Sequence, residues 1–145
     1  MKIIMAIGDS KFAEGSLNAL IAQFRPPDTE VRVLHVVEPI AVSVPPQMSP
    51  HYAPELEDLV KKGRELVEQA ANRLRAAGFK VDTAVEKGDI REKILDSAAG
   101  WGADLIVVGS HGPRGVSRFL LGSAAEFVTR HARCSVEIVR MPVDR

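Results

Sequence analysis

The chain has 145 residues, with 19 Lys and Arg side chains against 19 Asp and Glu side chains and a formal net charge of zero. This length favours one domain, and a composition that is 46% hydrophobic and 26% charged is typical of a globular protein and excludes disorder as the main state. The balanced charge and the aromatic content of 5% argue against a dedicated nucleic-acid binder.

The sequence also lacks the pattern of a membrane segment or an export signal. No apolar run approaches the ~20 residues that a membrane-spanning helix needs, and residues 1–7 lead directly into Gly8 without a signal-peptide cleavage pattern. Cys134 is the single cysteine, so no internal disulfide can form. We therefore expect a cytoplasmic protein that does not contact a membrane.

The first part of the chain has the pattern of a strand, a helix and a second strand. Residues 1–7 and 31–37 are rich in β-branched and apolar side chains, which predicts two buried strands. The apolar residues between them recur with the spacing of one helix face, and Pro26 and Pro27 must end that helix. The first unit is therefore predicted to be βαβ.

The middle of the chain continues this alternation after a proline-rich segment. Residues 38–54 contain several prolines and are predicted to form a mobile loop or lid. Helical spacing over 56–74 predicts the second helix, and apolar alternation over 79–85 predicts the third strand. Asp89 and Glu92 fit a capping pair at the start of a third helix.

The last third of the chain holds the most continuous apolar strand, residues 104–108, which ends at Gly109. Such a strand is typical of the centre of a parallel sheet that helices cover on both faces. A fourth helix is predicted to begin near Gly122, and Cys134–Val139 is predicted to be the last strand. Strict alternation of five strands and four helices predicts one doubly wound α/β domain over residues 1–145, with a parallel sheet and helices on both faces.

Ligands of open α/β sheets bind beyond the carboxyl ends of the strands. Small and acidic residues concentrate at these predicted ends, which are Gly8-Asp9-Ser10, Val36-Val37-Glu38, Lys87-Gly88-Asp89 and Gly109-Ser110-His111-Gly112.

The strongest motif runs from Gly109 to Ser123. Glycines at 109 and 112 allow a sharp turn with open backbone N–H groups, and Gly122 precedes a predicted helix N-terminus, which favours an anion. A phosphate group fits such a pair of half-sites. The alternative is that the glycines serve only as turns and that Ser123 only caps its helix.

This segment has the pattern G-x-x-G-x9-G-[ST], and it resembles the ATP-binding members of the universal stress protein family. The resemblance extends over essentially the whole chain, including the first strand up to Asp9, the His35 strand and the Gly102–Gly112 segment. It implies an adenine nucleotide alpha hydrolase-like fold that binds ATP, with Mg²⁺ or Mn²⁺ bridging the phosphates.

The resemblance also implies roles for individual residues. Asp9 and the backbone near Val36 would hold adenine and ribose, the segment of Gly109, His111 and Gly112 would border ribose and phosphates, and Gly122 with Ser123 would bind the phosphate tail. The candidate nucleotide-binding residues are Gly8, Asp9, Ser10, Val36, Val108, Gly109, His111, Gly112, Arg114, Gly122, Ser123 and Ala124.

Two departures from the family pattern affect these expectations. Ala124 and Ala125 stand where many members carry a β-branched or hydroxyl side chain, so one phosphate donor would be missing while the backbone donors remain. Glu137 stands in the last strand where the family usually has an apolar residue, which affects the expected dimer edge.

Several residues have a structural alternative to a binding role. Asp9 could pair with a helix N-terminus, Asp89 is expected to be a cap, and His35 is expected to be packed inside its strand. His111 could be a solvated loop residue, and Arg114 could be either a partner of phosphate or a surface residue.

We expect an ATP-binding regulatory module of stress response, whose nucleotide state is read by a protein partner that the sequence does not identify. A homodimer through Cys134–Val139 and little or no hydrolysis are expected as well, with no catalytic and no metal-ligating residue assigned. Two alternatives remain: a nucleotide-free homodimeric adaptor of the same fold, and an enzyme of related architecture. The enzyme would need a Ser-Gly-Gly-x-Asp-Ser type loop, which residues 7–10 lack.

Overall fold

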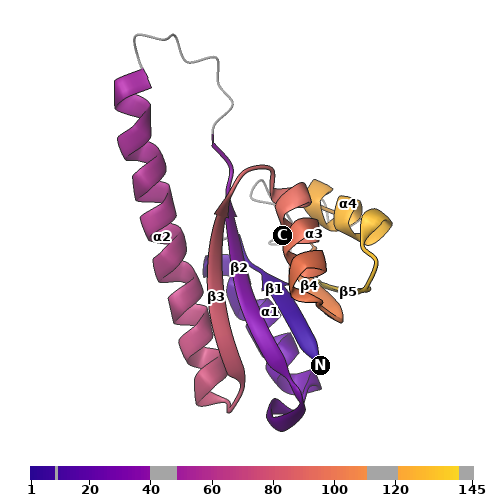
Figure 1. Ribbon diagram of the computed structural model, residues 1–145. Helices are drawn as coiled ribbons and strands as arrows, with labels where there is room; N and C mark the ends of the chain where they lie inside the picture. Colours follow the sequence, from indigo (N-terminus) through magenta and orange to yellow (C-terminus); the bar gives the residue numbers. More distant parts are fainter. Residues whose placement is uncertain (9, 40–48, 111–120, 141–145) are drawn as a thin grey trace, which may run out of the picture.

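The computed structural model describes residues 1–8, 10–39, 49–110 and 121–140 (Figure 1). Strands and helices alternate along these residues as the sequence predicts. In chain order the elements are β1 (Lys2–Ala6), α1 (Ser10–Gln23), the 3-10 helix η1 (Pro26–Asp28), β2 (Glu30–Val37), α2 (Ser49–Ala76), β3 (Lys80–Lys87), α3 (Ile90–Trp101), β4 (Leu105–Gly109), α4 (Ser123–His131) and β5 (Ser135–Val139).

The strands form a five-stranded sheet in the order β3-β2-β1-β4-β5. Each neighbouring pair in this order is parallel. Helices α1 and α2 pack on one face, and α3 and α4 pack on the other (Figure 1). The predicted doubly wound α/β fold is therefore confirmed.

Two apolar cores result because successive side chains of a strand point to opposite faces of the sheet. In β1, Ile3 and Met5 belong to the core beneath α1 and α2, whereas Ile4 belongs to the core beneath α3 and α4. All residues of 105–108 in β4 are buried. The apolar run without polar alternation thus identified a central strand correctly.

The long helix α2 corrects the predicted extent of the proline-rich loop. It begins at Ser49, so residues 49–54 are helical and the prediction of a loop up to residue 54 is wrong at that end. Pro50 falls in the first turn, where a backbone N–H has no partner within the helix, so proline is tolerated there. Pro54 lies one turn further and costs one hydrogen bond. Residues 40–48 of the expected loop lie outside the described residues.

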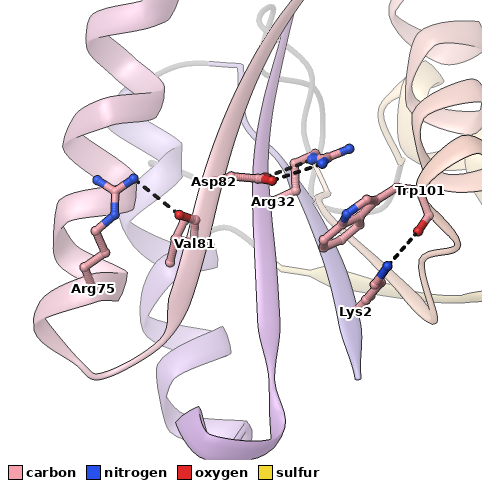
Figure 2. A network of polar contacts seen from close by, with 6 residues as sticks. All are labelled: Lys2, Arg32, Arg75, Val81, Asp82 and Trp101. Atoms are coloured by element: carbon pink, nitrogen blue, oxygen red, sulfur yellow. Dashed lines mark hydrogen bonds and ion pairs between the residues drawn. The ribbon is translucent and has the colours of Figure 1, made fainter.

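A polar network connects the end of α3 to the first residues of β1, β2 and β3 (Figure 2). Arg32 donates to the two carboxylate oxygens of Asp82 at 2.8 and 3.0 Å, and its guanidinium lies 4.5 Å from the ring centroid of Trp101. Lys2 Nζ donates to the Trp101 carbonyl oxygen at 3.3 Å. Gly102 then ends α3 with a φ of 74°, a conformation that favours glycine. These contacts stabilise the edge of the sheet where the strands begin.

Among the described residues, no helix is both long enough and apolar enough to cross a membrane.

Candidate functional site

The carboxyl ends of β1 and β4 form the point where the chain connections diverge. From β1 the chain crosses through α1 to β2, and from the adjacent β4 it crosses through α4 to β5 on the other side. The two helices cover opposite faces, which is the arrangement at which open α/β sheets bind ligands. Gly8 follows β1 and Gly109 ends β4, so both predicted residues lie at this switch point.

The start of α4 is fixed against the end of β4. The Gly122 N–H donates to the Ser110 carbonyl oxygen at 2.7 Å, and the Ser110 N–H donates to the Val139 carbonyl oxygen at 2.9 Å. Two segments that are 12 positions apart in the sequence therefore meet at the carboxyl edge of the sheet. This contact brings together Gly109 and Gly122, two glycines of the predicted phosphate motif.

Gly122 is the N-cap of α4, with extended backbone at φ −62° and ψ 154°, and no side chain of the described residues caps the helix. The first hydrogen bond within α4 runs from the Glu126 N–H to the Gly122 carbonyl oxygen at 3.0 Å. The N–H groups of Ser123 and Ala124 precede this bond and have no partner within the helix. Ser123 is exposed and is the first helical residue, so the alternative in which Ser123 caps the helix is wrong.

The end of β2 adds a buried wall beside the switch point. Val36 and Val37 are 7% and 4% exposed, and the Val37 carbonyl oxygen accepts from the Gly88 N–H at 3.0 Å. Glu38 follows in an exposed position. Val36 therefore contributes mainly backbone to this edge.

Asp89 caps α3, as the sequence predicts. Its carboxylate accepts from the backbone N–H of Arg91 at 2.9 Å and of Glu92 at 3.3 Å. The side-chain hydrogen bond from Arg91, followed by these backbone N–H groups, lowers the pKa of Asp89, with burial opposing the effect. Asp89 is therefore ionised at neutral pH and acts as a structural cap.

His35 is packed, as expected, and its contacts reveal a residue that the sequence analysis missed. The imidazole Nδ1 lies 2.8 Å from the Ile7 carbonyl oxygen, just beyond β1. A Cβ atom at Gly63 of α2 would lie 2.6 Å from Cδ2 of His35, so the helix backbone packs directly on the ring. A glycine inside a helical pattern was the available signal, because it usually marks a close approach.

The structure places eight of the twelve predicted binding residues, all at the carboxyl edge: Gly8, Ser10, Val36, Val108, Gly109, Gly122, Ser123 and Ala124. The other four, Asp9, His111, Gly112 and Arg114, lie outside the described residues.

The described part of the chain offers backbone donors at this edge rather than a set of reactive side chains. It contains no group of three or more His, Cys, Asp and Glu residues that could hold a metal ion. Cys134 precedes β5 at the opposite edge, and burial raises the pKa of its thiol. The arrangement is therefore suited to binding an anion.

Comparison with known proteins identifies the family of the chain. A model of the universal stress protein family matches residues 1–140. The alignment with the universal stress protein YxiE of Bacillus subtilis is 145 positions long and has 30% identity. It covers 96% of this chain and 98% of that protein.

Solved structures share the fold. The structure of protein MJ0577 is 26% identical, with a TM-score of 0.86 and coverage of 99% of this chain and 97% of that one. A universal stress protein family protein from Arabidopsis thaliana with AMP bound is 21% identical, with a TM-score of 0.68 and coverage of 100% and 94%. Two further universal stress proteins, in complex with cAMP and with dAMP, are 22% identical and have TM-scores of 0.63 and 0.65.

Proposed function

The chain belongs to the universal stress protein family, and we propose that it is an ATP-binding regulatory module whose nucleotide state is read by a partner protein. The observation that carries this proposal is the hydrogen bond from the Gly122 N–H to the Ser110 carbonyl oxygen, at 2.7 Å. It holds the N-terminus of α4 at the switch point between β1 and β4, where a phosphate can accept from helix N–H groups. The AMP, cAMP and dAMP complexes of proteins with this fold support an adenine nucleotide as the ligand.

In the proposed arrangement, the nucleotide lies along the carboxyl edge. Gly8, Asp9, Ser10 and Val36 border adenine and ribose, while Val108, Gly109, His111, Gly112 and Arg114 border ribose and phosphates. Gly122, Ser123 and Ala124 hold the phosphate tail. A Mg²⁺ or Mn²⁺ ion would bridge phosphate oxygens of the nucleotide and would neutralise their charge.

We also propose a homodimer through β5. This strand is at the edge of the sheet and pairs with β4 on one side, and an edge strand exposes backbone groups that can pair with a second chain. The Glu137 carboxylate accepts from Gln23 Nε2 of α1 at 2.9 Å. The charge of Glu137 is thus on the α1 side of the sheet, beside the proposed dimer edge.

Calorimetric titration of ATP into wild type and Gly122→Asp tests the phosphate site. Aspartate is a favoured N-cap residue, and the extended backbone of Gly122 suits it, so the fold should persist. The new carboxylate would occupy the place proposed for phosphate, so ATP binding should fall by at least roughly tenfold while adenosine binding changes little. Ser123→Ala should cost about 1–2 kcal/mol of ATP binding, because the backbone donors remain.

Gly100→Asp is the matched control, because it adds the same charge near the end of α3 at the opposite edge. Thermal unfolding of all variants separates lost binding from lost folding. Wild-type ATP affinity in a folded Gly122→Asp variant would contradict the phosphate site and favour the nucleotide-free adaptor.

A further inference from the structure

The imidazole of His35 has no role in the proposed contacts with nucleotide, yet it contacts Ile7, the residue that precedes Gly8 of the proposed site. His35 belongs to β2 and shares its side of the strand with Val31 and Val33, which pack beneath α1 and α2. Its Nδ1 lies 2.8 Å from the Ile7 carbonyl oxygen. A carbonyl oxygen can only accept, so Nδ1 carries the proton and donates it.

Helix α2 holds the ring in this position from the other side. A Cβ atom at Gly63 would lie 2.6 Å from Cδ2 and 3.4 Å from Nε2 of His35, and 3.4 Å from Cγ1 of Val85 in β3. Only a residue without a side chain allows the helix to pack this closely. The ring is therefore confined between α2, β3 and the end of β1.

The hydrogen bond from His35 fixes the peptide at which the chain leaves β1. The pairing of β1 with β2 ends at Ala6 and Leu34. Beyond it, the Ile7 N–H donates to the Leu34 carbonyl oxygen at 2.9 Å, and the Ile7 carbonyl oxygen accepts from His35. Both polar backbone groups of Ile7 are thus tied to β2, which sets the orientation of the peptide between Ile7 and Gly8.

Gly8 has no comparable support of its own. It is exposed, and no heavy atom of the described residues lies within 4 Å of the position that its Cβ would take. The chain must nevertheless turn from β1 into α1, which begins at Ser10. The orientation of Gly8 therefore depends on the peptide that precedes it.

We propose that His35 is a positioning residue of the adenine-nucleotide site, because it orients the Ile7–Gly8 peptide and so directs the segment that borders adenine and ribose. This inference rests on the proposed function. His35 acts through Ile7, at the nucleoside end of the site. Removal of the His35 imidazole should lower the affinities for AMP and ATP by the same factor. Gly122→Asp acts on the phosphate tail and should lower the affinity for ATP more than that for AMP.

Two substitutions separate the hydrogen bond from the packing of the ring. His35→Leu removes the donor and keeps a branched side chain of moderate size. His35→Asn keeps an N–H donor, Nδ2, at the same number of bonds from the backbone as Nδ1 of histidine. The amide of Gly8 is the direct reporter, because its nitrogen shares a peptide bond with the Ile7 carbonyl.

In the nucleotide-free protein, the ¹⁵N shift of Gly8 should move in His35→Leu and return toward the wild-type value in His35→Asn. An unmoved Gly8 amide in His35→Leu would overturn the assignment. If His35→Leu does not fold, Gly63→Ala keeps the imidazole but displaces it, and the same Gly8 shift is expected.

Calorimetry with AMP and ATP completes the test. His35→Leu should lower the affinity for both nucleotides roughly tenfold, and the affinities of His35→Asn should stay within about threefold of the wild-type values. The control Arg32→Leu removes the pair with Asp82 on the other side of β2 and should leave both affinities unchanged. If wild type binds neither nucleotide, the proposed function fails and this inference fails with it. If the wild-type protein binds nucleotide and His35→Leu binds it equally well, only the positioning role is overturned. The same holds if His35→Asn loses as much nucleotide affinity as His35→Leu.

Discussion

Gly63→Ala tests the packing of α2 on β2. In a helix interior with free space, this change stabilises the folded state by about 0.5–1 kcal/mol, because glycine loses more backbone entropy than alanine on folding. Here the added methyl group would lie 2.6 Å from Cδ2 of His35 and 3.4 Å from Cγ1 of Val85. Carbon atoms in contact are normally ~3.5–4.0 Å apart, so the imidazole has to move by about 1 Å.

Moving the ring should cost more than the alanine contributes. The displaced Nδ1 loses its hydrogen bond to the Ile7 carbonyl oxygen, now 2.8 Å long, and such a bond contributes about 0.5–1.5 kcal/mol. Overpacking of a filled interior costs about 1–3 kcal/mol more. After the gain in helix propensity is subtracted, we expect Gly63→Ala to lower the free energy of unfolding by about 2 kcal/mol.

Urea unfolding followed by circular dichroism measures this change. Gly100→Ala is the matched control, because Gly100 also lies in a helix and, in the part of the chain that the structure describes, no heavy atom lies within 4 Å of its Cβ position. This variant should be neutral or stabilising by up to about 1 kcal/mol. In a His35→Ala background the ring is absent, and Gly63→Ala should become stabilising. A stabilising Gly63→Ala in the wild-type background would refute the packing argument.

Three further predictions concern capping, assembly and turnover. Asp89→Ala should lower the free energy of unfolding by about 1 kcal/mol at neutral pH. Because the pKa of Asp89 is lowered in the folded state, the carboxylate stabilises the fold above its unfolded pKa of about 3.9, and the gap to wild type in urea titrations should close as the pH falls below that value. Sedimentation should show a homodimer that Glu137→Val tightens, because like charges near paired strands destabilise; a wild-type monomer at all concentrations would contradict this. ATP turnover, measured by phosphate release, should stay far below ~1 per second. Turnover at that rate would contradict the binding-module proposal and favour an enzyme of related architecture.

The alternation of elements was readable from the sequence because each element has a simple apolar pattern. The continuous apolar run of 105–108 identified the central strand, since a strand covered on both faces needs no polar side. The start of α2 was missed because Pro50 and Pro54 are usually helix breakers, although the first turn of a helix tolerates proline.

The site was predictable only in part. The spacing of Gly109 and Gly122 indicated two half-sites, and the contact of Gly122 with Ser110 brings their segments together. Gly63 inside a helical pattern was a signal of close packing, but its contact with His35 and the dependence of the Ile7 peptide on both were not predictable, because these residues are far apart in the chain. Such contacts arise from how closely a helix packs on a sheet, which periodicity does not encode.

The central claim is that an adenine nucleotide binds at the carboxyl edge of the sheet. An amide-resolved NMR titration of the wild-type protein with MgATP tests it most directly. The largest shift changes should occur at Gly8, Gly109 and Gly122–Ala124, whereas amides at the opposite edge, such as those of Lys80 and Gly102, should stay unchanged. Saturable changes confined to that opposite edge, or no change at all at millimolar ATP, would contradict the account.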